Sequence, residues 1–175
     1  MKIEAIDKST ALLYSEHKEL MVSRSGIDGA PIYNPFNQEM LDSWTWQPES
    51  HLASMSTELT APGWKRSWGI LEDGKFIGSV DLSGGSVLTN LHRCTLMMGV
   101  DRDYKAQGYG KGLLCFAISW AKESGLEWMD LGVFDTNTPA ISLYKKNGFI
   151  INGEVKDAFY VNGTSIGDIR MALNL

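Results

Sequence analysis

One glycine-rich stretch constrains the fold of this chain more than any other feature of its sequence. Residues 100–114 read VDRDYKAQGYGKGLL, with glycines at alternate positions from Gly108 to Gly112. An apolar run of strand length, residues 94–100, precedes the turn, and residues 112–123 follow with apolar side chains at helical spacing. A helix that starts at a glycine turn presents unpaired backbone N–H groups and the positive end of its dipole to an anion. The stretch therefore predicts a phosphate-binding turn between a strand and a helix.

Two common phosphate motifs do not fit the spacing of this turn. A P-loop needs serine or threonine after the lysine, but Gly112 follows Lys111. The dinucleotide fingerprint, if begun at Gly108, needs glycine at the position of Leu113. Lys105 and Lys111 either add positive charge to the site or are solvated surface lysines. The spacing disfavours a nucleoside triphosphatase and a dinucleotide-binding domain, and it leaves a pyrophosphate as a suitable ligand.

The rest of the chain alternates helical and extended patterns. Apolar residues at helical spacing predict helices, whereas apolar runs joined by Asp-Gly or Asn-Gly predict hairpins. Pro48 separates two short helices, and Gly125 and Gly148 each end one. The expected helices are residues 9–22, 36–41, 49–59, 112–123 and 139–147, and the expected strands are residues 2–6, 68–71, 75–82, 94–100, 127–133, 149–161 and 168–173. This order predicts one α/β domain with a mixed sheet and helices on both faces.

Composition argues against several classes of protein. The net charge of -5 and the sequence pI of about 5.2 disfavour a nucleic-acid partner, which requires a basic face. No apolar run reaches the length of a membrane span, and residues 1–7 lack the apolar core of a secretory signal. We therefore expect a cytoplasmic protein without a membrane partner. Cys94 and Cys115 have neither CxxC nor metal-ligand spacing, which predicts reduced thiols and no metal site.

Two motifs of this chain resemble the signatures of a known family. Gln107-x-x-Gly110-x-Gly112 is similar to the Gln/Arg-x-x-Gly-x-Gly/Ala signature of the GNAT superfamily of N-acyltransferases, whose loop binds the pyrophosphate of acyl-coenzyme A (CoA). Residues 137–149, NTPAISLYKKNGF, resemble the family's second signature, Asn-x-x-Ala-x-x-Leu-Tyr-x-Lys-x-Gly-Phe. The resemblance implies the GNAT fold, a mostly antiparallel mixed sheet with helices on both faces, in one domain over residues 1–175. Residues 67–175 would form the sheet core with the acetyl-CoA site, and residues 1–66 the variable substrate side.

The same resemblance assigns roles to residues of this chain. Met98, Gly99 and Val100 lie on the strand whose backbone pairs with the pantetheine arm in the family. A free N–H near Met98 would polarise the thioester oxygen. Gly99 fits either a bulge or relief of crowding. Tyr144 matches the tyrosine that often protonates the departing CoA thiolate. Asn137 matches a pantetheine contact and is also placed to cap a helix. The turn amides expected to hold the phosphates belong to Gln107, Gly108, Tyr109, Gly110, Lys111 and Gly112.

The implied reaction is direct attack of a neutral primary amine on the thioester of acetyl-CoA, without an acyl-enzyme. A cysteine nucleophile is the competing mechanism, although Cys94 and Cys115 lack an evident histidine partner. Thr95 occupies the position at which the family often has a glutamate base, and this departure leaves the base unassigned among Glu72, Asp81 and a water chain.

The amine is expected to lie against the N-terminal half of the chain. Tyr33, Phe36 and Trp68 are the candidate substrate residues there. Further aromatics of this half either line a pocket or fill the core, namely Trp44, Trp46 and Trp64. The expected acceptor is a small-molecule amine, an amino acid or a peptide N-terminus. A protein N-terminal acetyltransferase of the ribosomal type and a non-catalytic acyl-CoA sensor remain open alternatives, and a homodimer is compatible with the sequence because relatives are often dimers.

Overall fold

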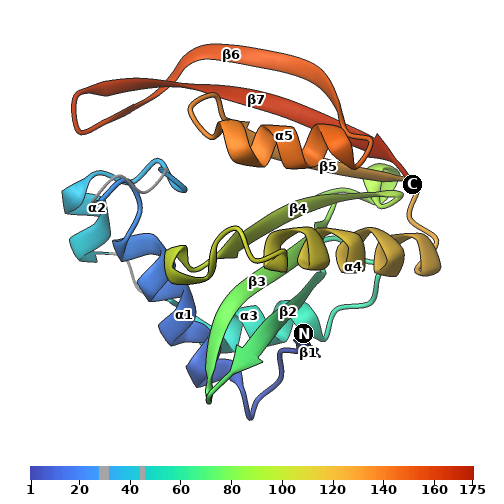
Figure 1. The fold of residues 1–175 in the computed structure, drawn as a ribbon. Coiled ribbons are helices and arrows are strands. Elements are labelled where there is room, and N and C mark those ends of the chain that lie inside the picture. Colours follow the sequence, from blue (N-terminus) through green and yellow to red (C-terminus); the bar gives the residue numbers. More distant parts are fainter. Residues whose placement is uncertain (28–31, 44–45) are drawn as a thin grey trace.

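The computed structural model describes residues 1–27, 32–43 and 46–175 (Figure 1). Trp44, one of the aromatics considered for a substrate pocket, lies outside these residues. The helices are α1 (Ala11–Ser23), α2 (Gln38–Ser43), α3 (Pro48–Met55), α4 (Tyr109–Glu123) and α5 (Thr138–Lys146), with short 3-10 turns at Leu88–Asn90 and Arg102–Tyr104. The strands are β1 (Ile3–Ala5), β2 (Lys65–Glu72), β3 (Lys75–Gly84), β4 (Arg93–Val100), β5 (Trp128–Phe134), β6 (Ile150–Val161) and β7 (Thr164–Asn174).

Within the described ranges the strands form one seven-stranded sheet in the order β1-β2-β3-β4-β5-β7-β6. Neighbouring strands are antiparallel except for β4 and β5, which run parallel. The helix α4 connects these two strands, because a parallel pair requires a crossover. The structure confirms the predicted α/β fold with a mostly antiparallel mixed sheet. Among the helices described, none is long and apolar enough to cross a membrane.

Two hairpins close through the turns that the sequence predicts. Asp73 and Gly74 join β2 to β3, and Asn162 and Gly163 join β6 to β7, all with positive φ. Two successive residues with positive φ form a type I′ turn, whose twist matches that of the strands it joins. Asp and Asn tolerate this left-handed conformation, and glycine adopts it without strain.

Several element boundaries differ from the sequence prediction, and the starts of α4 and β2 are two of them. The helix α4 begins at Tyr109 rather than at Gly112, so Gly110 and Gly112 lie in its first turn. Each of these glycines costs the helix about 1 kcal/mol relative to alanine, but the fully buried Leu113 and Leu114 hold this turn against the sheet. The strand β2 begins at Lys65, before the apolar run that predicted it.

Helices cover the sheet on both faces, as predicted. The helix α4 lies along one face together with α5 (Figure 1), and it buries its apolar stripe there. Trp68 of β2 packs beneath α4, with its ring centroid 5.3 Å from that of Phe116 and 4.9 Å from that of Trp120. Trp68 is only 7% exposed. The structure thus places this substrate candidate in the core, and Trp64 is buried in the same cluster.

The opposite face of the sheet is polar where α1 and α3 cover it. Because successive strand residues point to opposite faces, Ser67, Ser79 and Asp81 all point away from α4. His51 of α3 lies 2.9 Å from the Ser67 hydroxyl through Nε2, and the Nε2 of His17 on α1 lies 3.2 Å from the Ser79 hydroxyl. These contacts join the N-terminal helices to the centre of the sheet.

The burial of His17 predicts a pH dependence of folding. His17 is 3% exposed, and burial together with the charge of Lys18 lowers its pKa from 6.5 to about 4. Because the pKa of His17 is lower in the folded than in the unfolded chain, neutral His17 contributes to the free energy of unfolding. This contribution is fully present above pH 6.5 and is lost as the pH falls towards 4. The loss is roughly 3 kcal/mol, from the size of this pKa shift. We expect urea unfolding to become progressively easier across this pH window.

The matched variant for this test is His17→Gln, which keeps a donor for Ser79 and does not titrate. Its unfolding free energy should depend less steeply on pH between 6.5 and 4 than that of the unmodified chain. An identical pH dependence in both proteins would show that His17 does not cause the loss.

Candidate active site

The parallel strands β4 and β5 diverge part of the way along their length. Their pairing runs from Arg93↔Trp128 to Thr95↔Asp130, although β4 continues to Val100 and β5 to Phe134. A bidentate ion pair between Arg93 and Asp130, with N–O distances of 2.8 and 2.6 Å, fixes the strands where they still pair. Beyond that point the ribbons of β4 and β5 separate (Figure 1). The sheet therefore has an internal edge on β4.

The internal edge of β4 exposes backbone hydrogen-bonding groups. The N–H of Asp101, directly after β4, donates to the carbonyl of Ile77 on the β3 side at 2.8 Å. Backbone groups of successive residues alternate between the two sides of a strand. Val100 and Met98 consequently direct their N–H and C=O groups away from β3 and into the gap. An extended ligand with amide groups can bind to this edge as an additional strand would.

A cavity of about 290 Å³ occupies the gap between β4 and β5. Asn137 and Tyr144, at the start and near the end of α5, both line it. Asn137 also caps α5, because its side-chain oxygen accepts a hydrogen bond from the N–H of Ala140 at 3.4 Å. We call this cavity the cleft, and its other lining residues are Ile32, Tyr33, Thr95, Leu96, Met97, Met98, Gly132, Val133, Phe134, Phe159, Asp168 and Arg170.

The glycine turn lies beside the cleft and has the geometry of an anion site. Gly108 caps α4 with a φ of 87°, a conformation that favours glycine. The N–H groups of Tyr109, Gly110 and Lys111 come before the first intrahelical hydrogen bond, which runs from the Gly112 N–H to the Gly108 carbonyl at 3.0 Å. A Cβ on Gly110 would lie 3.9 Å from the side chain of Met98, a residue of the cleft. The residues present therefore fit a diphosphate at the helix start with its attached arm in the cleft.

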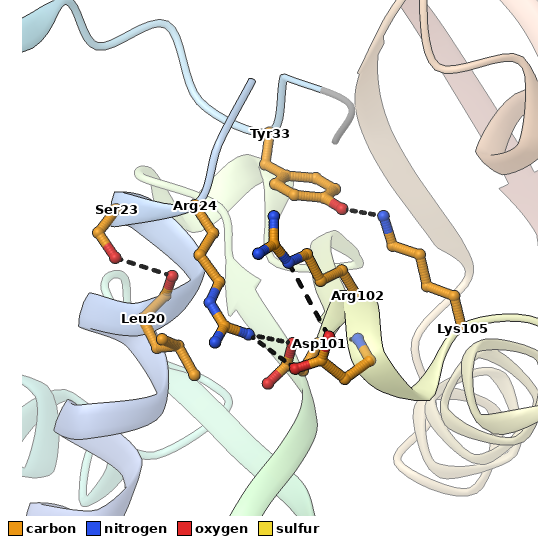
Figure 2. A network of polar contacts seen from close by, with 8 residues as sticks. Leu20, Ser23, Arg24, Tyr33, Asp101, Arg102 and Lys105 are labelled. Atoms are coloured by element: carbon orange, nitrogen blue, oxygen red, sulfur yellow. Dashed lines mark hydrogen bonds and ion pairs between the residues drawn. The ribbon is translucent and has the colours of Figure 1, made fainter. Parts of the chain in front are cut away.

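A network of ionic contacts ties the N-terminal segment to the segment that leads into this turn (Figure 2). Arg24, directly after α1, pairs with Asp101 at 2.8 Å and with Asp103 at 3.2 Å. Lys105 donates a hydrogen bond to the hydroxyl of Tyr33, and its ammonium also lies 4.9 Å from the centre of the Tyr33 ring. Lys105 is an exposed lysine that contacts a residue of the candidate substrate side.

A second cavity, of about 420 Å³, lies on the polar face of the sheet beneath α1 and α3. It shares Tyr33, Thr95 and Met97 with the cleft, so the two cavities meet across β4. Phe36, the other substrate candidate of this segment, lines the second cavity. We call this cavity the acceptor cavity, and its other lining residues are Lys18, Val22, Asn34, Pro35, Trp46, His51, Lys65, Asp81, Leu82 and Ser83.

Tyr144 has the environment of a neutral acid. Its side chain is 8% exposed, and its ring centroid lies 5.6 Å from that of Phe149. Burial raises the pKa of its phenol to about 12, because the charged phenolate is poorly solvated there. Tyr144 therefore carries its proton at neutral pH and can donate it to a group in the cleft.

Other residues singled out from the sequence lie elsewhere. The register between β3 and β4 runs without a shift, and a Cβ on Gly99 would lie 2.8 Å from Met21, so Gly99 makes room for α1 rather than forming a bulge. Glu72 accepts a hydrogen bond from the hydroxyl of Tyr109 at 2.8 Å and lines neither cavity. Burial raises the pKa of the Cys94 thiol to about 12, which disfavours the thiolate that a nucleophile requires.

The acceptor cavity contains polar residues that the sequence analysis did not assign to it, above all Lys18, His51 and Lys65. Lys18 forms an ion pair with Asp81, and His51 contacts Ser67, whose hydroxyl donates a hydrogen bond to the same carboxylate. Asp81 was considered only as one possible base. A signal for this cluster was present in β3, where Ser79, Asp81 and Ser83 alternate with apolar residues, as expected of a strand with one polar face. The described residues contain no cluster of three or more His, Cys, Asp or Glu side chains that could hold a metal ion.

The fold and the site together define an α/β protein that can bind an extended, phosphate-bearing ligand between two splayed parallel strands. Residues 31–149 match the model of the acetyltransferase (GNAT) family. This chain therefore belongs to the acetyltransferase (GNAT) family.

Solved structures and a curated relative agree with this family. A GNAT-family acetyltransferase from Streptococcus pneumoniae has a TM-score of 0.82 at 21% identity, with 99% of both chains covered. A putative acetyltransferase from Salmonella typhimurium, solved with acetyl-CoA, has a TM-score of 0.78 at 20% identity, with 100% of this chain and 94% of the other covered. Streptothricin acetyltransferase A of Bacillus subtilis (strain 168) is 38% identical over 74 residues, which is 42% of this chain and 42% of that relative. The match to this curated relative thus spans less than half of either chain.

Proposed function

We propose that this protein is an N-acetyltransferase that transfers the acetyl group of acetyl-CoA to a primary amine within a ternary complex. The observation that carries the proposal is the junction of the two cavities at Thr95 and Met97. A donor bound in the cleft and an acceptor bound on the polar face would meet there. The family and its acetyl-CoA-bound structural neighbour support acetyl-CoA as the donor.

Each part of the cleft has a role in holding the donor. Acetyl-CoA supplies an activated carbonyl carbon. The amides of Tyr109, Gly110 and Lys111 would bind its diphosphate, and the free edge of β4 near Met98 would pair with its pantetheine arm. An N–H of this edge that faces the gap is placed to polarise the thioester oxygen.

The reaction requires two proton transfers. A neutral amine forms the N–C bond as the C–S bond breaks, the attacking nitrogen loses one proton, and the departing sulfur gains one. Tyr144, protonated and facing the cleft, is the candidate donor to sulfur. The proton from nitrogen passes to solvent or to a polar group of the acceptor cavity.

The proposed activity predicts release of free CoA thiol only when an amine is present. Purified protein with acetyl-CoA should release thiol on addition of members of a primary-amine panel, and mass spectrometry should find the acetylated amine. When the concentrations of both substrates are varied, the double-reciprocal plots of initial rate should give intersecting lines, as expected for a ternary complex. Parallel lines, or a trapped acyl-cysteine, would contradict direct transfer. Tight CoA binding without thiol release for any amine would instead indicate an acyl-CoA sensor.

A further inference from the structure

The acceptor cavity contains an ion pair at its polar end. The ammonium of Lys18 lies 2.5 Å from Oδ2 of Asp81, and each side chain is 15% exposed. The other carboxylate oxygen, Oδ1, accepts hydrogen bonds from the hydroxyls of Tyr14 and Ser67. Each carboxylate oxygen has two acceptor positions, so Oδ1 is saturated while Oδ2 can accept one more donor. An ammonium group of a substrate can bind at that position.

The charges around the acceptor cavity do not cancel. Burial opposes ionisation of Asp81, but Lys18 and the hydrogen bonds from Lys18, Ser67 and Tyr14 outweigh it and lower the pKa of the carboxyl. Burial and the charges of Lys65 and Lys18 outweigh the pull of Asp81 and lower the pKa of His51, which keeps it neutral at pH 7. Two lysines and a single ionised carboxylate line the cavity, so its described lining residues together carry one net positive charge.

A net positive charge disfavours an acceptor whose only charge is its own ammonium. It favours an acceptor that brings a carboxylate with the amine. Lys18 has two N–H donors beyond the one that it gives to Asp81, and Lys65, at the start of β2, also lines the cavity. Phe36, Trp46 and Val22 supply an apolar wall for the rest of the molecule.

We propose that the acceptor cavity binds a zwitterionic α-amino acid with an apolar side chain, its ammonium on Asp81 and its carboxylate on Lys18 and Lys65. Asp81 pairs in register with Met97, which lines both cavities, so an amine held on Asp81 lies beside the cleft. The bound ammonium first releases one proton to solvent, and the resulting neutral amine then attacks the thioester carbonyl. This assignment rests on the proposed acetyltransferase function and narrows its substrate class.

The direct test compares acceptors that differ only at the carboxylate. Leucine, methionine and phenylalanine are each measured against the corresponding amide and the decarboxylated amine, by release of CoA thiol. We expect kcat/KM to fall by at least about tenfold when the carboxylate is removed, mainly through KM, because a charge-assisted contact is lost. Equal or faster turnover of the decarboxylated amines or of a polyamine such as spermidine would overturn the inference and leave the acetyltransferase function intact. Absence of thiol release with every amine would overturn both.

Two variants locate the carboxylate contact. Lys65→Met removes an exposed ammonium that has no role in the core, so the fold should persist. In this variant the kcat/KM of leucine should lose most of its advantage over that of 3-methylbutylamine, which is decarboxylated leucine. Lys18→Met should do the same, although it also leaves Asp81 without its ion-pair partner. Lys122→Met, an exposed position on α4 outside the residues that line the cavity, is the matched control and should keep the advantage. An unchanged preference in both Lys65→Met and Lys18→Met would contradict the placement.

Discussion

Replacing Gly110 with aspartate is expected to weaken acetyl-CoA binding by roughly 100-fold while the protein remains folded. A Cβ at this position would meet its nearest neighbour, Leu143, at 3.8 Å, which is an ordinary van der Waals contact. A carboxylate in the first turn of α4 is also favourable for the helix, because it lies at the positive end of the dipole. The same carboxylate would place a negative charge beside the proposed diphosphate site and would repel the phosphates. Binding and stability should therefore respond in opposite directions.

Calorimetric titration with CoA and a thermal melt by circular dichroism measure the two effects separately. Gly110→Ala is the matched control, since it adds the Cβ without a charge and should lose far less affinity than Gly110→Asp. If Gly110→Asp is folded and binds CoA like the unmodified chain, the turn is not the diphosphate site. A loss of binding accompanied by unfolding in Gly110→Asp alone would contradict the packing at this position.

Local patterns account for the parts of the fold that the sequence predicted well. The glycine turn, the Asp73-Gly74 and Asn162-Gly163 hairpins and the order of the C-terminal elements each depend on residues close together in the chain. Their conformations follow from backbone sterics and from apolar spacing. The start of α4 was placed too late because glycine disfavours a helix interior, and only the packing of the following leucines overrides that preference.

The face of the sheet to which a side chain points was not available from local patterns. Trp68 belongs to an apolar strand that is covered on both sides, and an aromatic residue there suits a pocket and a core equally well. Its pairing with Val80, in the alternation that directs Ser67 and Asp81 to the opposite face, places it beneath α4. Assigning Trp68 to the core beneath α4 therefore required the register of neighbouring strands.

The acceptor cavity depends on contacts between distant parts of the chain. Lys18 and His51 come from separate helices. Lys18 pairs directly with Asp81 on a central strand, and His51 is linked to the same carboxylate through Ser67. Neither residue belongs to a motif with a fixed spacing, so each resembles an ordinary surface or core residue in the sequence. The link between Tyr33 and Lys105 has the same character, because it joins the N-terminal segment to the phosphate turn across the structure (Figure 2). The proposed donor site is thus encoded by local motifs, and the proposed acceptor site by tertiary packing.

Tyr144→Phe is expected to lower kcat by about 100-fold with little change in the affinity for acetyl-CoA, because an acid acts mainly as the sulfur leaves. The phenyl ring keeps the contact with Phe149, so the variant should fold as well as the unmodified protein. Tyr160→Phe on β6, where the side chain is 73% exposed, is the matched control and should keep full activity. Steady-state rates of thiol release and CoA titrations of the three proteins provide the comparison.

The pH profile tests whether Tyr144 acts as an acid rather than as a packing residue. Its pKa of about 12 lies above the ordinary value of 10, so its acidic form persists to higher pH than that of an exposed tyrosine. At saturating substrates and at any pH below about 11, Tyr144 should keep its proton and kcat should not fall through its ionisation. A tyrosine with an unshifted pKa would instead make kcat decline near pH 10. In Tyr144→Phe the residual rate should show no dependence on this ionisation. If Tyr144→Phe retains the kcat of the unmodified chain, the proton that reaches sulfur comes from another donor, and Tyr144 serves only to pack α5 against the sheet.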